Sequence, residues 1–220
     1  MTTTIWNAAI GRRSLLKSIG ALGAGALFLK TPWLFAEQLT LTPRQTEGPY
    51  YPIQLPLDTD NDLVIVNDSV TPAIGTVAYI SGRVLTPAGS PLRNANVEIW
   101  QADNSGAYLH PRSSGYANRD RNFQGYGRFE TASSGEYLFR TIKPGLYTGR
   151  TRHVHFKVTV PGHAVLTSQL YIKGEPGNAR DGVLNEIRDA RARESVIVPF
   201  EPIQDSSVGA LAAHFDIVVG

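Results

Sequence analysis

Two histidines separated by a single residue, His153 and His155, begin an apolar stretch of the chain. Side chains alternate between the two faces of a β-strand, so both imidazoles would point to one side if this stretch is a strand. Two imidazoles on one face can bind a single metal ion. The chain has no cysteine, and the remaining hard ligands (phenolates, carboxylates and water) favour iron or a similar metal over a structural zinc ion. An exposed polar strand face is the alternative interpretation of the pair taken alone.

Length and composition predict one all-β domain with many turns. The chain has 220 residues, of which 42% are hydrophobic, and it contains 14 prolines and 21 glycines. Short alternating segments bounded by glycine and proline are typical of a β-sandwich. The expected strands are 77–86, 95–101, 136–140, 153–160, 165–172 and 214–219, with an irregular segment at 37–75 and a short helix or structured loop at 178–193. The net charge of +2 gives no indication of nucleic-acid binding.

The first 36 residues resemble an export signal of the twin-arginine type. Arg12 and Arg13 precede a moderately apolar stretch at 19–29 that is too short to span a membrane comfortably. We therefore expect a signal segment at 1–36, a domain at 37–220, contact with the membrane only during export, and a periplasmic or extracellular destination. An uncleaved anchoring helix is the alternative. Without the signal, the chain would carry 17 basic and 19 acidic residues.

Four segments of the sequence together indicate a known protein family, which none of them would indicate alone. They are Gln45-Thr46-Glu47-Gly48-Pro49-Tyr50, Asn94 to Asp103 with Gly106-Ala107-Tyr108, Phe139 to Tyr147, and Arg150 to Phe156. In combination they strongly resemble the intradiol ring-cleavage dioxygenases, the group that contains protocatechuate 3,4-dioxygenase and catechol 1,2-dioxygenase. The resemblance runs from about residue 45 to residue 219.

The resemblance implies one non-haem Fe(III) ion held by two tyrosinates and two histidines. The ligands of the family fall on Tyr108, Tyr147, His153 and His155. A trivalent metal lowers the pKa of a phenol, which is ordinarily near 10, far enough to hold the phenolate at neutral pH. Ordinary packing with the hydroxyl at the surface is the alternative for the two tyrosines.

Further site residues follow from the same resemblance. Arg150 stands where the family places an active-site arginine, which is expected to stabilise negative charge on a bound catecholate. Gln169 matches a glutamine beside that arginine, and its alternative is a strand residue that hydrogen-bonds a loop. Tyr50 would line the substrate entrance. Gly149 stands where protocatechuate dioxygenase catalytic subunits carry a bulky tryptophan in a longer insertion, so we expect a more open pocket.

The reaction that the resemblance implies is cleavage of a catechol-type diol by O2 to a cis,cis-muconate-type diacid. The diol would bind iron through both oxygens and displace a hydroxide and Tyr147, which together take up its two protons. The sequence leaves the substrate open between catechol, hydroxyquinol and larger plant or lignin-derived catechols. It also leaves open whether the chain forms a homo-oligomer.

Two other functions compete with this interpretation. The pattern from Gly82 to Tyr147 also resembles transthyretin-like and prealbumin-like modules, many of which only bind or stiffen. The expected fold is therefore an all-β, transthyretin/prealbumin-like sandwich with long active-site loops, and an exported binding or structural module without catalysis is the main alternative. A zinc hydrolase is disfavoured because no well-placed carboxylate accompanies the histidine pair. His110 could lie behind the ligands, while His163 and His214 are expected to have structural or solvent-facing roles.

Overall fold

Alternating apolar side chains produce two β-sheets in the computed structural model, which describes residues 38–147 and 149–220. The predicted signal segment lies outside these residues. The strands are β1 (Val77–Leu85), β2 (Asn96–Trp100), β3 (Tyr126–Glu130), β4 (Glu136–Ile142), β5 (His153–Thr159), β6 (Leu166–Ile172), β7 (Ile197–Val198), β8 (Glu201–Pro202), β9 (Leu211–His214) and β10 (Ile217–Val218). The helices are short: η1 (Tyr116–Asn118), η2 (Pro176–Arg180), α1 (Gly182–Asn185) and α2 (Ala190–Ser195).

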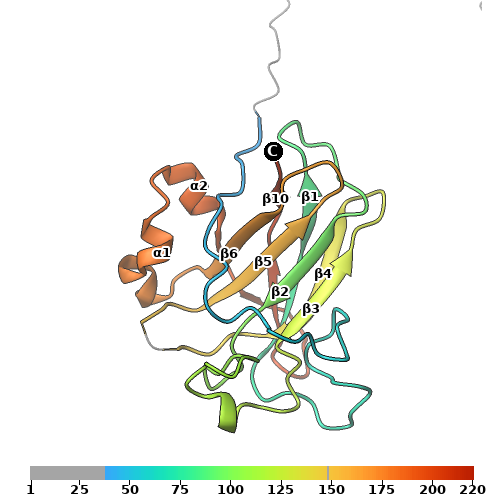
Figure 1. Cartoon of the computed structure of the whole chain (residues 1–220), viewed down its shortest axis with the longest axis vertical. Helices are drawn as coiled ribbons and strands as arrows, with labels where there is room; N and C mark the ends of the chain where they lie inside the picture. The colour runs from blue at the N-terminus through green and yellow to red at the C-terminus, as the bar shows by residue number, and fades with distance from the viewer. Residues whose placement is uncertain (1–37, 148) are drawn as a thin grey trace, which may run out of the picture. The chain divides into compact units, whose positions relative to one another are not determined.

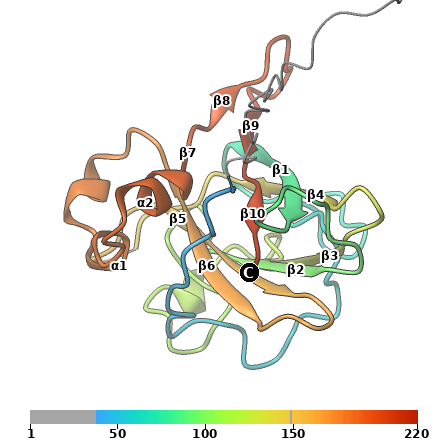
Figure 2. The same cartoon turned by 90° about the horizontal axis from the view of Figure 1, so that it is seen from above.

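Each sheet has five strands within the described residues. The first follows the order β10-β1-β9-β8, and β4 pairs with β1 in the antiparallel sense. The second follows the order β3-β2-β5-β6-β7; its four long strands pair with one another in the antiparallel sense, and β7 is parallel to β6. Figure 2 shows the two sheets as separate layers, with α1 and α2 to one side of the second sheet.

The inner faces of the two sheets share one hydrophobic core. Val97 and Ile99 of β2 are fully buried in it, together with residues of β1 and β4. From β5, the ring of Phe156 contacts Phe215 at 5.2 Å and Tyr137 of β4 at 6.1 Å between ring centroids. The all-β prediction is therefore confirmed for the described residues, whereas the likeness to transthyretin modules stays a prediction.

The outer face of the second sheet carries the polar and aromatic side chains of interest. His155 lies opposite Trp100 of β2 on one side and Gln169 of β6 on the other, and His153 lies opposite Tyr171. Because strand residues alternate, these side chains share the face that Val154 and Phe156 of β5 do not occupy. The two histidines thus share one face of β5, as the spacing in the sequence predicts.

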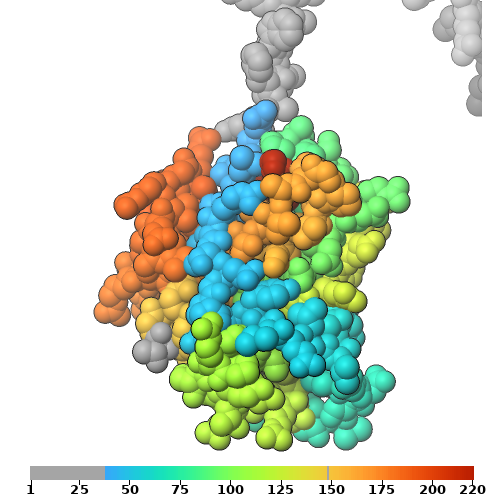
Figure 3. All heavy atoms as spheres, in the orientation of Figure 1, coloured from blue at the N-terminus to red at the C-terminus, as the bar shows by residue number. Residues whose placement is uncertain are grey.

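The irregular segment before β1 covers this outer face, crossing β6, β5 and β2 in turn (Figure 1). The contacts are a backbone hydrogen bond from Gln45 to Thr167 at 2.9 Å, an ion pair of Glu47 with Lys157 at 2.8 Å, and a hydrogen bond from Tyr51 to Glu98 at 2.9 Å. In the space-filling view its blue and cyan atoms form a band over the strands (Figure 3). A buried site can therefore form on the outside of the sheet.

The observed strands differ from the predicted ones near the C-terminus. The strand expected at 214–219 is interrupted, because β9 ends at His214 and β10 begins at Ile217. Between them, the carbonyl of Phe215 accepts a hydrogen bond from Tyr137 and lies where a Cβ at Gly82 would be. The strand β3 was not predicted, and the segment at 178–193 contributes to η2, α1 and α2. Among the described helices, none has the length and hydrophobicity that a membrane crossing requires.

Candidate metal centre

Four side chains predicted as ligands lie together at one end of the outer sheet face. Nε2 of His153 lies 3.2 Å from Nε2 of His155 and 3.2 Å from the hydroxyl of Tyr108. The ring of Tyr147 lies 5.3 Å from that of Tyr108 and 5.7 Å from that of His153, measured between centroids. Two histidines from β5 and two tyrosines from separate loops thus converge on one small volume.

The two imidazoles are held in different ways. Nδ1 of His153 lies 2.6 Å from the carbonyl oxygen of Thr151, and an N–H there directs the lone pair of Nε2 toward the cluster. The ring of His155 instead stacks on Trp100, with a centroid distance of 4.8 Å and an interplanar angle of 10°. Against the same imidazole lies Gly48, where a Cβ would come within 3.3 Å of Cε1.

Tyr108 is placed by a tight turn that begins at the buried Asp103. One carboxylate oxygen of Asp103 accepts hydrogen bonds from the backbone N–H groups of Ser105 and Ala107, at 2.8 Å and 2.9 Å. Gly106 in this turn has φ of +91°, and a Cβ there would lie 2.1 Å from the carbonyl oxygen of Leu146. The two tyrosine-bearing loops can therefore meet only because position 106 has no side chain.

Replacing Gly106 with alanine should separate these two loops. We expect a loss of about 3 kcal/mol in the free energy of unfolding, because a left-handed backbone and a steric clash both penalise the new Cβ. Gly162→Ala is the matched control, since Gly162 has φ of +81° but nothing within 4 Å of its Cβ position, and it should cost about 1 kcal/mol, the penalty of the left-handed backbone alone. Chemical denaturation of both variants checks this. Equal losses would show that the contact between the loops contributes nothing.

Burial sets the protonation of the four side chains. It lowers the pKa of His153 to about 4 and that of His155 well below its ordinary value, and the positive charge of Arg150 lowers both further. Burial raises the pKa of Tyr108 and Tyr147, while Arg150 opposes the rise in each. At neutral pH both imidazoles are neutral and have lone pairs to offer. A cation bound between the two phenols would lower their pKa values by stabilising the phenolate anions.

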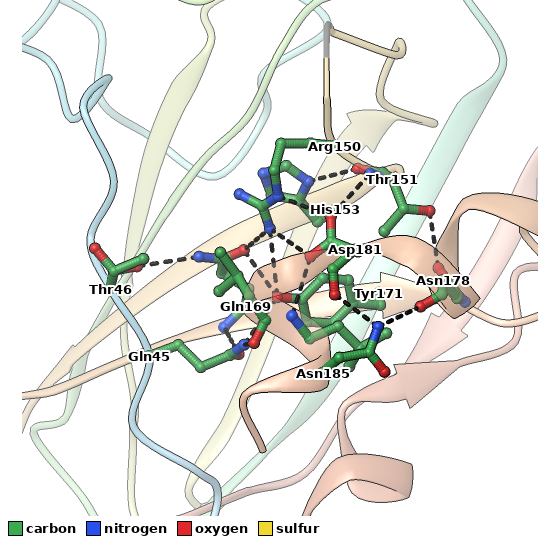
Figure 4. Close-up of polar contacts among 12 residues, drawn as sticks. Gln45, Thr46, Arg150, Thr151, His153, Gln169, Tyr171, Asn178, Asp181 and Asn185 are labelled. Carbon is green, nitrogen blue, oxygen red and sulfur yellow. Dashed lines mark hydrogen bonds and ion pairs between the residues drawn. The ribbon is translucent and has the colours of Figure 1, made fainter. Parts of the chain in front are cut away.

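The side chain of Arg150 is held beside this cluster by Asp181, Gln169 and Tyr171, and its Nη2 lies 3.5 Å from the hydroxyl of Tyr171 (Figure 4). Its Nε donates to Oδ2 of Asp181 at 2.7 Å, and its Nη2 donates to Oε1 of Gln169 at 2.7 Å. Its backbone N–H donates to the carbonyl of Tyr147 at 3.2 Å. The guanidinium is therefore held in place, and its charge acts on all four clustered side chains.

Gln169 has its amide orientation set by the segment that crosses the sheet. Its Nε2 donates to the carbonyl of Thr46 at 3.0 Å, which leaves Oε1 to accept from Arg150 and, at 3.0 Å, from the hydroxyl of Tyr171. The side chain of Gln45 accepts from the backbone N–H of Gln169 and donates to Tyr171. Gln45, the first residue of the Gln45–Tyr50 motif, therefore helps to position Gln169 and Tyr171.

The two predicted pocket residues both lie beside Tyr147. The ring of Tyr50 lies 5.0 Å from that of Tyr108 and 5.8 Å from that of Tyr147. Gly149 has φ of +83°, is exposed, and has nothing within 4 Å of its Cβ position. The surface next to Tyr147 is therefore open at Gly149.

The other histidines lie away from the four clustered side chains. His110 is buried, its Nδ1 accepts from the backbone N–H of Arg112, and its ring faces Tyr50 at 5.7 Å. His163 and His214 are exposed, and His214 lies 3.1 Å from Asp216.

Arg152 and Asp181 have partners that could not be predicted from the sequence. The side chain of Arg152 is partly exposed and binds the carbonyl of Pro144 and the carboxylate of Glu175. Asp181 was not predicted as part of the site. The available signal was its position as an N-cap before Val183 and Leu184, which predicts a helix start and not a partner for Arg150.

The clustered donors fit a hard trivalent metal ion. Two nitrogens that each lie about 2 Å from one ion would be about 3 Å apart, close to the separation of the two imidazole nitrogens. Among the described residues, no three His, Cys, Asp or Glu side chains are grouped for metal binding, so the donor set here is two phenols and two imidazoles. Phenolate oxygens are hard ligands that stabilise Fe(III).

Comparison with known proteins identifies the family. The family model described as Dioxygenase matches residues 46–220. The chain is 36% identical to the protocatechuate 3,4-dioxygenase beta chain of Burkholderia cepacia over 66% of this chain and 65% of that one. It is 30% identical to catechol 1,2-dioxygenase 2 of Acinetobacter lwoffii over 70% of this chain and 62% of that one. The chain thus spans less than two thirds of the length of these two curated relatives.

A solved structure agrees with this assignment. The dioxygenase domain of a dioxygenase carbohydrate-binding protein fusion from Streptomyces sp. SirexAA-E is 34% identical, with a TM-score of 0.62, over 81% of this chain and 97% of that one. The family-model match, residues 46–220, includes the strands and loops that carry the clustered side chains. The chain therefore belongs to the family of intradiol ring-cleavage dioxygenases, oxidoreductases that cleave aromatic diols.

Proposed function

We propose that this protein is an Fe(III)-dependent dioxygenase that cleaves a catechol-type diol with O2 to a cis,cis-muconate-type diacid. The observation that carries the proposal is the convergence of Tyr108, Tyr147, His153 and His155 on one volume. These four side chains would hold the ion. A bound ferric ion would supply a Lewis acid and a template for the diol and O2.

Of the two tyrosines, Tyr147 is better placed to be displaced by a substrate. Tyr108 is only 1% exposed and follows the Asp103 turn, whereas Tyr147 is partly exposed and lies two residues before Gly149, which has nothing within 4 Å of its Cβ position. The phenolate oxygen of Tyr147 would accept one of the two protons that a catechol loses on binding, and a hydroxide would accept the other. The positive charge of Arg150 beside it would stabilise the resulting catecholate.

The open surface at Gly149 supports a substrate larger than catechol or one that carries a substituent. Relatives named for protocatechuate, catechol and hydroxyquinol define the first compounds to test. Export by a twin-arginine signal in residues 1–36, and hence a periplasmic or extracellular site of action, is part of the proposal and rests on the sequence alone.

Oxygen labelling tests the proposed reaction. Iron-loaded protein should consume O2 with a catechol, and with 18O2 both labelled atoms should appear in a diacid opened between the two hydroxyl-bearing carbons. A mass spectrum and a proton NMR spectrum of the product decide this. Cleavage outside the two hydroxyl-bearing carbons, or no O2 uptake across a panel of substituted catechols, would contradict the proposal.

Trp100 should matter for metal retention because it orients His155 by stacking. Trp100→Leu is expected to speed release of iron to a chelator about 10-fold or more, the effect typical of losing a group that orients a ligand. Trp100→Phe keeps an aromatic face and should release iron much more slowly than the leucine variant. The rate is measured by loss of visible absorbance. Equal rates in the two variants would show that stacking does not hold the imidazole.

A further inference from the structure

We propose that Asp181 is a positioning residue, which holds the guanidinium of Arg150 in the orientation that the reaction needs. The inference rests on the proposed function, because it assigns a role to a residue that acts through Arg150. Asp181 lies 31 residues after Arg150 in the sequence, on the segment that leads from η2 into α1. No side-chain pattern in the sequence links the two.

The carboxylate of Asp181 is saturated with donors. Its side chain is fully buried. Oδ2 accepts from Nε of Arg150 at 2.7 Å and from the backbone N–H of Thr151 at 3.0 Å. Oδ1 accepts from Nη2 of Arg150 at 3.3 Å and from the backbone N–H of Leu184 at 3.0 Å. A two-pronged contact of this kind fixes the plane of the guanidinium as well as its position.

The same contacts hold Arg150 against the predicted metal ligands. The side chain of Arg150 is 14% exposed, so it could turn toward solvent if nothing retained it. Asp181 holds it on one side and Gln169 on the other, at 2.7 Å each (Figure 4). The backbone of Arg150 is bonded to the carbonyl of Tyr147. Asp181 thereby ties the loop that carries a predicted ligand to the start of α1.

Helix capping is the competing role for Asp181, and the chain offers a control for it. Asp181 caps α1 by accepting from Leu184, and Asp189 caps α2 in the same way by accepting from Ala192 at 2.7 Å. Asp189 is exposed. Asparagine is a good N-cap residue, so Asp→Asn at either position preserves capping and removes the charge. Only at position 181 does the change remove the anionic partner of Arg150.

The test is a double-mutant cycle with catechol as substrate. Asp181→Asn should lower kcat/KM by about 10- to 100-fold, while iron content and the visible spectrum stay as in the wild type. In an Arg150→Gln background, Asp181→Asn should have no further effect, because the group it positions is gone. Asp189→Asn should leave kcat/KM unchanged.

Two outcomes overturn the proposal. One is an unchanged kcat/KM in Asp181→Asn, and the other is an equal loss from Asp181→Asn in the wild-type and Arg150→Gln backgrounds. Wild-type protein that binds iron and oxidises no catechol would instead overturn the proposed function. If Asp181→Asn does not fold, hydrogen exchange at Nε–H of Arg150 in the wild type decides, with the signal assigned by its absence in Arg150→Gln. Slow exchange supports a fixed guanidinium, and exchange as fast as in free arginine refutes it.

Discussion

Replacing His155 with alanine should give a folded protein that does not retain iron. The variant loses one of the four clustered donors and leaves a gap beside Trp100, while the hydrophobic core on the opposite face of β5 is untouched. We expect a loss of about 3 kcal/mol in the free energy of unfolding. The loss in iron affinity should exceed the roughly 100-fold that follows from removing a group that merely orients a ligand, and turnover should disappear with the iron.

Iron content after desalting, circular dichroism and O2 uptake measure these effects. His163→Ala is the control, since His163 is exposed in a turn that follows β5, and it should keep iron, fold and turnover. Retention of iron and of full activity in His155→Ala would refute the assignment of His155 as a ligand.

Replacing Arg150 with glutamine should separate catalysis from metal binding. The four clustered donors stay in place, so iron and the visible spectrum should be retained. The fixed positive charge is lost, so kcat/KM should fall by about 100- to 1,000-fold. The protein should also be destabilised by about 3–5 kcal/mol, because the buried carboxylate of Asp181 loses its partner. Arg150→Lys should not restore activity, since an ammonium cannot reproduce the two-pronged contact.

Arg152→Gln is the matched control for Arg150→Gln. Arg152 lies on the same loop but binds Glu175 and the carbonyl of Pro144, so its loss should leave kcat/KM within about 5-fold of the wild-type value, as expected for a polar contact that does not face the reacting groups. Steady-state kinetics on iron-matched samples compares the two. Similar losses in both variants would show that the charge of the loop as a whole matters, and not the guanidinium of Arg150.

Local patterns in the sequence predicted the sheet face that carries the site. The spacing of His153 and His155 fixes their common side on β5 because alternation is a property of the strand itself. The same alternation puts Val97 and Ile99 of β2 on one face of that strand, the face that packs in the core. Such inferences need no knowledge of how distant segments pack.

The supports of the site could not be predicted in this way. Trp100 and Gly48 come to His155 from segments more than 50 residues earlier in the chain, and Asp181 comes to Arg150 from 31 residues later. These contacts exist only after the second sheet has formed and the irregular segment before β1 has crossed its outer face. The interruption at Phe215 likewise depends on its contact with Tyr137 of β4, which the apolar pattern of 214–219 does not reveal.

The most direct test of the central claim is the iron content and visible spectrum of the purified protein. Two phenolates and two imidazoles on one ferric ion predict one iron per chain and a burgundy colour from tyrosinate-to-iron charge transfer. The band should shift when a catechol is added without O2, because the proposed function has the diol taking the place of Tyr147. A protein that stays colourless after loading with ferric iron, while correctly folded, would contradict the account.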